Sequence, residues 1–290
     1  MVKKAHFITG KGGVGKSLLG AALARFLSLQ KQQIILTELN DPSFYKEFLE
    51  LPTIGYQPSP WIEKVSVAQW SPDECLKEYA LHLIKIQSLY KLFFENPISK
   101  SLIDVAPGLH ELALLGKITS SPRHHGPPMP GDQLVIDSYS TGHFLSLLRA
   151  PSAMAEVIEF GPMGEQSRSI QQWITNPEFT KIHLVTLPEE LPTTESIELA
   201  QQLQSEFKLN PTIYLNKMLK LTTEDLKDLP AKIKTDFEQQ MQLERTCLQK
   251  LQATGLQVIE LPFVTSSQTK TLITELSNVL SLHQRESHAF

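Results

Sequence analysis

The sequence predicts an α/β fold in which short buried strands alternate with helices. First, an apolar run at 5–9 leads into a glycine-rich loop and then into residues 18–29, whose apolar side chains recur at helical spacing. Second, the short β-branched and apolar run at 33–38 is typical of a buried parallel strand. Third, further apolar runs of strand length recur along the chain, at residues 133–137, 181–187, 211–215 and 258–261.

Length and composition are those of an ordinary globular protein. The 290 residues suffice for one large domain, 1–290, and 41% of them are hydrophobic and 20% charged. The net charge of −4, the pI near 6.2 and the scattered lysines and arginines predict no nucleic-acid partner. The two cysteines, Cys75 and Cys247, are too far apart in sequence to indicate a disulfide framework or a zinc site. The first strand begins almost at the N-terminus, and no stretch reaches the roughly 18–20 apolar residues of a membrane span, so we expect a cytoplasmic protein without stable membrane insertion.

The glycine-rich loop after the first strand matches the phosphate-binding pattern G-x-x-x-x-G-K-[ST] over its full length. Its glycines let backbone N–H groups turn toward a polyphosphate. Lys16 starts the following helix and can reach the β- and γ-phosphates, and the hydroxyl of Ser17 is placed to ligate Mg²⁺. The residues expected to bind ATP here are Gly10, Lys11, Gly12, Gly13, Val14, Gly15, Lys16, Ser17 and Leu18.

Lys11 directly follows the first glycine, and the resulting GKGGVGKS resembles the deviant Walker A loop of SIMIBI-class ATPases. That class includes the MinD/ParA and ArsA/Get families. The resemblance implies a homodimer that encloses two nucleotides, in which this lysine reaches the phosphates held by the partner subunit. Lys11 and Lys16 are therefore catalytic candidates; the alternative is a solvated lysine beside the loop.

The loop after the strand at 33–38 corresponds to switch I of these ATPases, where an aspartate orients the attacking water. Counting from Lys16 without gaps places Asn40 at that position, whereas the Asp41-Pro42 pair resembles the ArsA/Get switch and favours Asp41. An asparagine can orient water but cannot accept a proton, so hydrolysis would be slow if Asn40 holds the site. Glu38 is a further candidate, although an acidic residue at a strand end is as often a structural hydrogen-bond acceptor.

The middle of the chain predicts a helical insert. Apolar spacing predicts helices over 72–94, 98–105 and 109–118. This stretch, about 72–120, stands where ArsA/Get proteins insert the subdomain that handles cargo or an effector. The alternative is that its apolar faces pack on the nucleotide-binding core.

Two flanking segments predict loops. Residues 51–63 carry three prolines and a glycine, and a strand is expected after them at 64–70. The proline- and glycine-rich stretch at about 120–132 predicts an exposed, poorly ordered loop. His124 and His125 within it lack neighbouring ligand spacing, which favours solvated side chains over a metal site.

The apolar run QLVID ends in Asp137, as expected of a Walker B strand whose carboxylate holds a Mg²⁺-bound water. The residues from Asp137 to Pro151 then resemble the ArsA/Get switch II signature D-[ST]-x-P-T-G-H-x-L-x-L-L-x-x-P, which MinD and ParA proteins lack. Ser140 replaces the proline of that signature, a change expected to loosen the coupling of γ-phosphate sensing to switch movement. Read without the family, Ser140 and Thr141 are a helix N-cap and His143 a first-turn residue.

The C-terminal half continues the resemblance. The run VTLPEELPTTES at 185–196 is similar to one beside the family's dimer and effector face, and Thr193 with its neighbours predicts the start of a helix. Asn216 stands where the family uses an asparagine to hydrogen-bond adenine; the alternative is an asparagine that makes a turn. Pro262 and Phe263 resemble the segment that backs the base.

The resemblance covers the chain from the phosphate loop to Phe263 and implies a P-loop NTPase fold, a mostly parallel sheet flanked by helices. It implies a Mg²⁺-dependent ATPase, a dimeric nucleotide switch that acts on a protein client or effector held by the helical insert. Two alternatives stay open: a regulatory or scaffold protein with little turnover, motivated by Asn40 and Ser140, and a ParA/MinD-like positioning ATPase, disfavoured by the TGH run and the missing basic surface. Arsenite transport and tail-anchored-protein targeting are disfavoured, since clustered thiols, a CxxC and a methionine-rich groove are missing.

Overall fold

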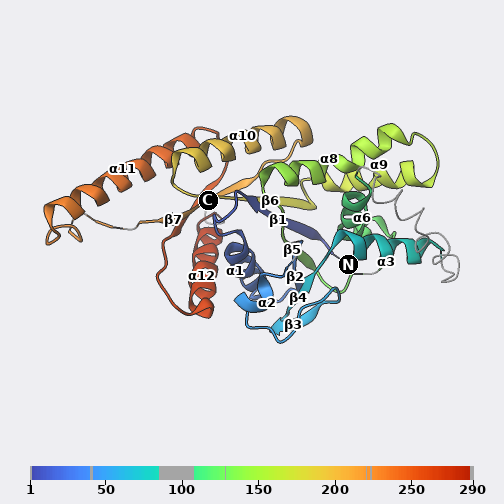
Figure 1. Ribbon diagram of the computed structural model, residues 1–290, viewed down its shortest axis with the longest axis horizontal. Helices are drawn as coiled ribbons and strands as arrows, with labels where there is room; N and C mark the ends of the chain where they lie inside the picture. The colour runs from blue at the N-terminus through green and yellow to red at the C-terminus, as the bar shows by residue number, and fades with distance from the viewer. Residues whose placement is uncertain are drawn as a thin grey trace.

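The computed structural model describes residues 2–39, 42–84, 108–127, 129–219, 221–222 and 224–287. Its centre is an eight-stranded sheet with helices on both faces, as Figure 1 shows. The strand order is β3-β4-β2-β5-β1-β6-β7-β8, and every described neighbour pair is parallel except β3 with β4. The predicted α/β class and mostly parallel sheet are confirmed.

The strands are β1 (Lys4–Gly10), β2 (Ile34–Glu38), β3 (Ser59–Ile62), β4 (Val65–Gln69), β5 (Gln133–Asp137), β6 (Thr180–Thr186), β7 (Thr212–Met218) and β8 (Val258–Pro262). The described helices are α1 (Lys16–Ser28), α2 (Tyr45–Phe48), α3 (Pro72–Ile84), α6 (Leu109–Ile118), α7 (Ser120–Arg123), α8 (Thr141–Val157), α9 (Pro162–Ile174), α10 (Glu190–Phe207), α11 (Ala231–Gln252) and α12 (Thr269–Ser287). The expected helix at 98–105, the end of the helix expected at 72–94, and both switch I candidates, Asn40 and Asp41, lie outside the described residues.

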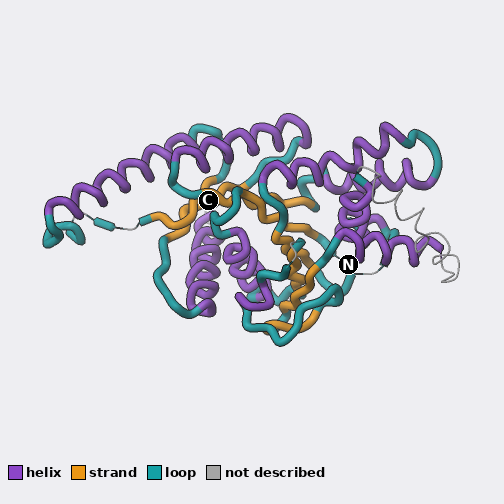
Figure 2. The backbone as a smooth tube through the Cα atoms, viewed as in Figure 1, coloured by secondary structure: helices purple, strands orange, loops and turns teal. Residues whose placement is uncertain are grey.

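Two apolar cores lie on opposite faces of the sheet. Helices α1 and α12 pack together over one face, and α6, α8 and α10 contribute buried side chains to the other (Figure 2). Strand β1 serves both cores, because successive side chains of a strand point to opposite faces: Phe7 lies in one core and Ile8 in the other. The sheet is buried on both sides, which explains why its central strands read as continuous apolar runs.

The prediction of a loop throughout 51–63 is wrong at its end, where β3 pairs with β4 in the antiparallel direction. Pro60 lies inside β3, and the register shifts between Pro60 and Ile62. A proline is tolerated in this strand because β3 is at the edge of the sheet and needs no ladder donor on its outer side. The prolines in 51–63 therefore led to the prediction of a loop, because a strand with a proline is tolerated only at the edge of a sheet.

The stretch at 120–132 is also not loop throughout, because α7 occupies its first four residues and buries Ser120 and Pro122. Arg123 holds this turn: its guanidinium donates to the carbonyl oxygen of Gly116 at 2.8 Å and to the hydroxyl of Thr119 at 2.8 Å. A partly buried side chain with several hydrogen bonds thus outweighs the local proline and glycine content.

Helix α10 begins at Glu190, three residues before the predicted start at Thr193. Pro192 lies in its first turn, where a missing N–H costs nothing. The Thr193 and Thr194 hydroxyls donate to the carbonyl oxygens of Leu187 and Glu190 instead of capping the helix. The early start places Glu195 in the second turn.

Within the described residues, no helix combines the length and the apolar character that crossing a bilayer requires.

Candidate nucleotide-binding site

The site lies at the carboxyl ends of β1, β5 and β2. The register pairs Ile8 of β1 with Asp137 of β5, and Asp137 with Glu38 of β2. The glycine-rich loop leaves β1 at this edge and enters α1 at Lys16. The crevice beyond the carboxyl ends of parallel strands is where α/β sheets bind their ligands.

Two loop glycines are required by close approaches of the chain. Gly10 has φ of 144°, and a Cβ there would lie 2.2 Å from the carbonyl oxygen of Val185 on β6. Gly15 has φ of 100°, and its Cβ would lie 2.4 Å from Nδ2 of Asn216. A side chain at position 10 would push the loop away from the backbone of β6, whereas one at position 15 would be strained by the positive φ and would displace the Asn216 side chain.

Lys16 lies over this loop. Its Nζ donates to the carbonyl oxygens of Gly10 at 3.2 Å and Lys11 at 3.0 Å. Burial lowers the pKa of Lys16, and the nearby charge of Asp137 partly offsets the effect. The ammonium is thus held by neutral carbonyls, which a phosphate oxygen can replace as a stronger partner.

Asp137 is fully buried, and neither of its carboxylate oxygens has a hydrogen-bond partner among the described residues. Burial raises its pKa to about 6, and the charge of Glu38 adds to the rise; the Ser17 and Tyr45 hydroxyls and the charge of Lys16 lower the pKa in part. A buried carboxylate without partners is costly, and a hard divalent cation supplies the missing interaction.

This orphaned carboxylate beside a hydroxyl fits Mg²⁺, with Asp137 and Ser17 as the residues that would hold it. Two more buried hydroxyls near the strand ends, those of Thr37 and Ser138, also lack a partner in the described part of the chain. Oxygen atoms are the donor set that Mg²⁺ prefers.

Glu38 acts as a structural acceptor in this structure. Its carboxylate accepts the backbone N–H groups of Phe44 at 2.9 Å and Tyr45 at 3.3 Å, and the hydroxyl of Ser43 donates to it as well. Burial raises the pKa of Glu38, and these three donors lower it. Glu38 therefore fixes the start of α2.

Lys11 pairs within its own chain. Its Nζ lies 2.8 Å from Oε1 of Glu195 on α10, and both side chains are partly exposed. The pairing of Gly10 with Val185 brings the end of β6, and hence α10, to the loop. Sequence reasoning singled out the run around Glu195 but not this contact, which depends on where α10 starts.

Asn216 lies within β7, is 5% exposed and supports the loop. Its Nδ2 donates to the carbonyl oxygen of Val14 at 2.8 Å, and its Oδ1 accepts the N–H of Lys217 at 2.9 Å. One N–H and one lone pair of the amide stay available for a base edge. Phe263, after Pro262 at the end of β8, is 51% exposed and donates its N–H to Met218 on the neighbouring strand. The base contacts of Asn216, Pro262 and Phe263 stay predictions.

The residues after Asp137 contact β1, the strand that precedes the glycine-rich loop, and lead into α8. The hydroxyl of Thr9 donates to the carbonyl oxygen of Tyr139 at 2.9 Å, and the ring of Tyr139 stacks on His143 with centroids 3.9 Å apart. Ser140 is the N-cap residue of α8 with extended backbone, although its side chain makes no capping hydrogen bond. The segment thus leads from the edge of the phosphate site into the helix.

Comparison with known families matches residues 3–163, more than half of the chain, to the anion-transporting ATPase model. The chain belongs to the anion-transporting ATPase family. The matched part of the chain includes the glycine-rich loop, Asp137 and the whole of α8. Glu195, Asn216 and Phe263 lie beyond the matched residues.

Curated relatives agree with this ATPase family. The chain is 28% identical to ATPase BagA of Mycobacterium tuberculosis over 72% of its own length and 64% of that relative. It is 24% identical to an arsenical pump-driving ATPase of Escherichia coli over 96% of its length and 50% of the relative, and 24% identical to the ATPase ASNA1 homolog of Entamoeba dispar over 73% and 76%. The chain thus spans less than two thirds of BagA and half of the E. coli protein.

Proposed function

We propose that the protein is a Mg²⁺-dependent ATPase that works as a homodimeric nucleotide switch. The observation that carries the proposal is the buried, unpartnered carboxylate of Asp137 beside a complete phosphate-binding loop. In this proposal Lys16 binds the β- and γ-phosphates, and Ser17 and Asp137 hold Mg²⁺, which neutralises phosphate charge when bound. Asp41 or Asn40 orients the attacking water.

Lys11 serves the partner's nucleotide in this proposal. Its ammonium must then exchange the carboxylate of Glu195 for a phosphate oxygen across the dimer interface. The exchange is feasible because the Lys11–Glu195 pair is partly exposed, and exposed ion pairs contribute only about 0–1 kcal/mol. A triphosphate carries more negative charge than one carboxylate and can displace it.

The switch acts on a client or effector through the helical insert. Helix α8 begins at Thr141, after the N-cap residue Ser140, and packs against α6 of the insert and against α9. Movement at the γ-phosphate therefore has a contiguous path of packed helices to follow.

The apolar residues of α6 face the core, as the alternative interpretation of the insert expects. Apolar side chains are instead exposed at the α8–α9 turn, where Val157 is 82% and Phe160 85% exposed. We place the client contact at or beside this turn, where exposed apolar groups are available for a partner.

Phosphate release by wild type and by Lys16→Ala tests the ATPase. The account expects Mg²⁺-dependent release by wild type, background release by Lys16→Ala, and wild-type release by the control Lys250→Ala, whose residue is exposed on α11. Equal, background-level release by all three proteins would contradict turnover. Retained Mg²⁺-dependent ATP binding in that case would favour the regulatory or scaffold alternative.

A further inference from the structure

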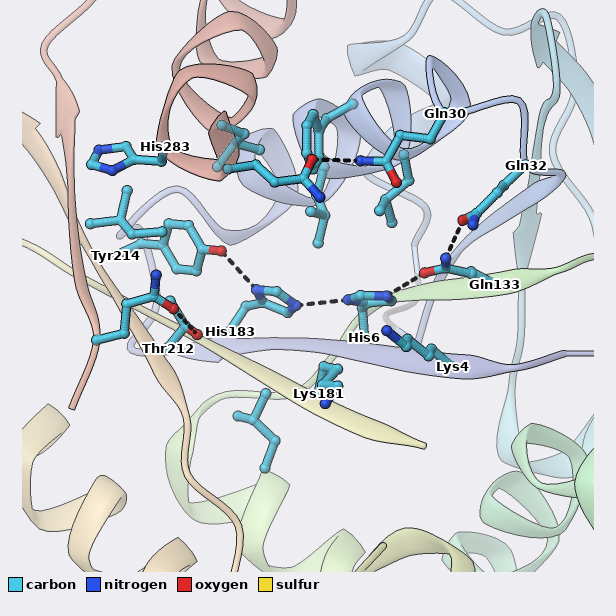
Figure 3. Close-up of a pocket in the computed structure, with 18 of the residues that line it drawn as sticks. Lys4, His6, Gln30, Gln32, Gln133, Lys181, His183, Thr212, Tyr214 and His283 are labelled. Atoms are coloured by element: carbon cyan, nitrogen blue, oxygen red, sulfur yellow. Dashed lines mark hydrogen bonds between the residues drawn. The ribbon is translucent and has the colours of Figure 1, made fainter. Parts of the chain in front are cut away.

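A second pocket lies at the amino ends of the central strands, whereas the phosphate loop lies at their carboxyl ends. It has a volume of about 410 Å³, within the range of small-molecule sites. Figure 3 shows its floor, formed by the first residues of β1, β5, β6 and β7, beneath the C-terminal ends of α1 and α12. Gln30, two residues after the end of α1, donates to Gln284 of α12 at 2.8 Å and so joins the two helix ends beside the pocket.

The floor carries a row of buried polar side chains. The Tyr214 hydroxyl contacts Nδ1 of His183 at 3.0 Å, Nε2 of His183 contacts Nδ1 of His6 at 2.9 Å, and Nε2 of His6 contacts the side-chain oxygen Oε1 of Gln133 at 2.6 Å. Gln133 in turn donates to Gln32. Figure 3 shows this row, whose members Gln133, His6, His183 and Tyr214 come from the neighbouring strands β5, β1, β6 and β7.

The row is satisfied with both imidazoles neutral. Gln133 offers an oxygen, so His6 carries its proton on Nε2 and accepts on Nδ1; His183 then donates from Nε2 and accepts from Tyr214. Burial lowers the pKa of His6 to about 4 and that of His183 well below its ordinary value, with Lys181 lowering both further. The histidines therefore supply hydrogen bonds and no charge near pH 7.

The positive charge of the pocket belongs to two lysines. Lys4 and His6 are two residues apart on β1, Lys181 and His183 are two apart on β6, and His6 pairs with Lys181 in the register. Residues two apart on a strand share a face, so both lysines lie on the pocket side. No aspartate or glutamate is among the described residues that line the pocket, and neither lysine has an ion-pair partner among the described residues.

The remaining wall is apolar. Its lining residues are Leu23, Phe26 and Leu27 of α1, Leu280 of α12 and Ile259 of β8. An occupant must therefore satisfy two ammonium groups at one side and fill an apolar wall at the other.

We propose that this pocket binds a small organic anion, whose carboxylate or phosphate group lies between Lys4 and Lys181 and whose apolar body packs against Phe26 and Leu280. Both lysines lack a carboxylate partner, and charge-assisted hydrogen bonds to an anion are the strongest interaction they can gain. The neutral histidine row holds the floor rigid beneath the anion. This site is separate from the phosphate loop, which leaves β1 at its other end.

Calorimetric titration with octanoate and octyl phosphate tests the proposal, with 1-octanol as the neutral probe. Wild type should bind at least one anionic probe and bind 1-octanol at least about tenfold more weakly, a difference of about 1.4 kcal/mol. Binding of only one anion identifies the head group as carboxylate or phosphate. Failure of both anions to bind better than 1-octanol would overturn the proposal.

The matched variants remove two positive charges in each case. Lys4→Met with Lys181→Met should lose about tenfold or more of the anion affinity, whereas Lys232→Met with Lys250→Met, both exposed on α11, should keep it. Circular dichroism and ATP binding check that the first variant is folded. Unchanged anion affinity in the folded pocket variant, or an equal loss in the α11 variant, would overturn the assignment to this pocket.

Discussion

Asp137 is a buried carboxyl group whose two oxygens lack hydrogen-bond partners in the described part of the chain. Its pKa rises from the ordinary 3.8 to about 6, so between these values the folded protein keeps a proton that the unfolded chain has released. The free energy of unfolding of the metal-free protein therefore falls as pH rises from about 4 to 6, by on the order of 3 kcal/mol from this group.

Asp137→Asn should remove this dependence, because an amide does not titrate. We expect the variant to gain stability relative to wild type as the pH rises from 4 to 7 without metal, and to lose the stabilisation that Mg²⁺ with ATP gives wild type. Urea denaturation at both pH values, with and without Mg²⁺, measures this. Parallel pH profiles of the two proteins would refute the electrostatic account of Asp137.

Glu195 competes with phosphate for Lys11 in the proposed switch. Glu195→Gln should lower the ATP concentration that half-assembles the dimer by a few-fold, about what an exposed ion pair contributes. Sedimentation with Mg²⁺ and increasing ATP measures the midpoint, and Glu198→Gln on the same helix is the control. A higher midpoint in Glu195→Gln would mean that Glu195 positions Lys11 instead of holding it back.

The loop between β1 and α1 is shaped by the strands beside it. Gly10→Ala should destabilise the protein by about 1–3 kcal/mol, because its Cβ would meet the Val185 carbonyl at a left-handed φ. Gly12→Ala is the matched control, since no atom lies within 4 Å of its Cβ position. Thermal denaturation without nucleotide compares the two, and equal shifts would contradict the close packing of the loop on β6.

The elements that the sequence predicted well are those with strong local signals. The phosphate loop, β5 with Asp137, and α6 at 109–118 follow from glycine spacing, an apolar run and helical periodicity. The elements that it missed depend on tertiary context: β3 is tolerated around Pro60 because it is an edge strand, and α7 is held by Arg123.

The contacts of the candidate sites were harder to foresee than their residues. Lys11 and Glu195 are 184 positions apart and meet only because Gly10 pairs with Val185. The anion pocket did leave a signal, because Lys-x-His occurs at 4–6 and again at 181–183. Its meaning depends on β1 and β6 being neighbours in register, which local pattern cannot supply.

In the whole molecule, the two binding regions lie at opposite ends of the strands and are one strand length apart. The nucleotide site lies at the carboxyl ends of the strands and the proposed anion pocket at their amino ends, with α1 reaching from Lys16 to Phe26 between them. The proposed dimer joins two such molecules through the nucleotide edge. The anion pocket, at the opposite edge, stays within each chain.

Mixing two inactive variants tests most directly whether two chains complete each other's nucleotide sites. The Lys16→Ala chain lacks the lysine of its own nucleotide site but can still supply Lys11 to the partner's site. The Lys11→Ala chain keeps Lys16 in its own site but cannot supply Lys11 to the partner's site. In an equal mixture about half of the dimers are mixed, each with one complete site, so phosphate release should recover to about a quarter of the wild-type rate. Release no greater than the average of the two separate variants would contradict the account.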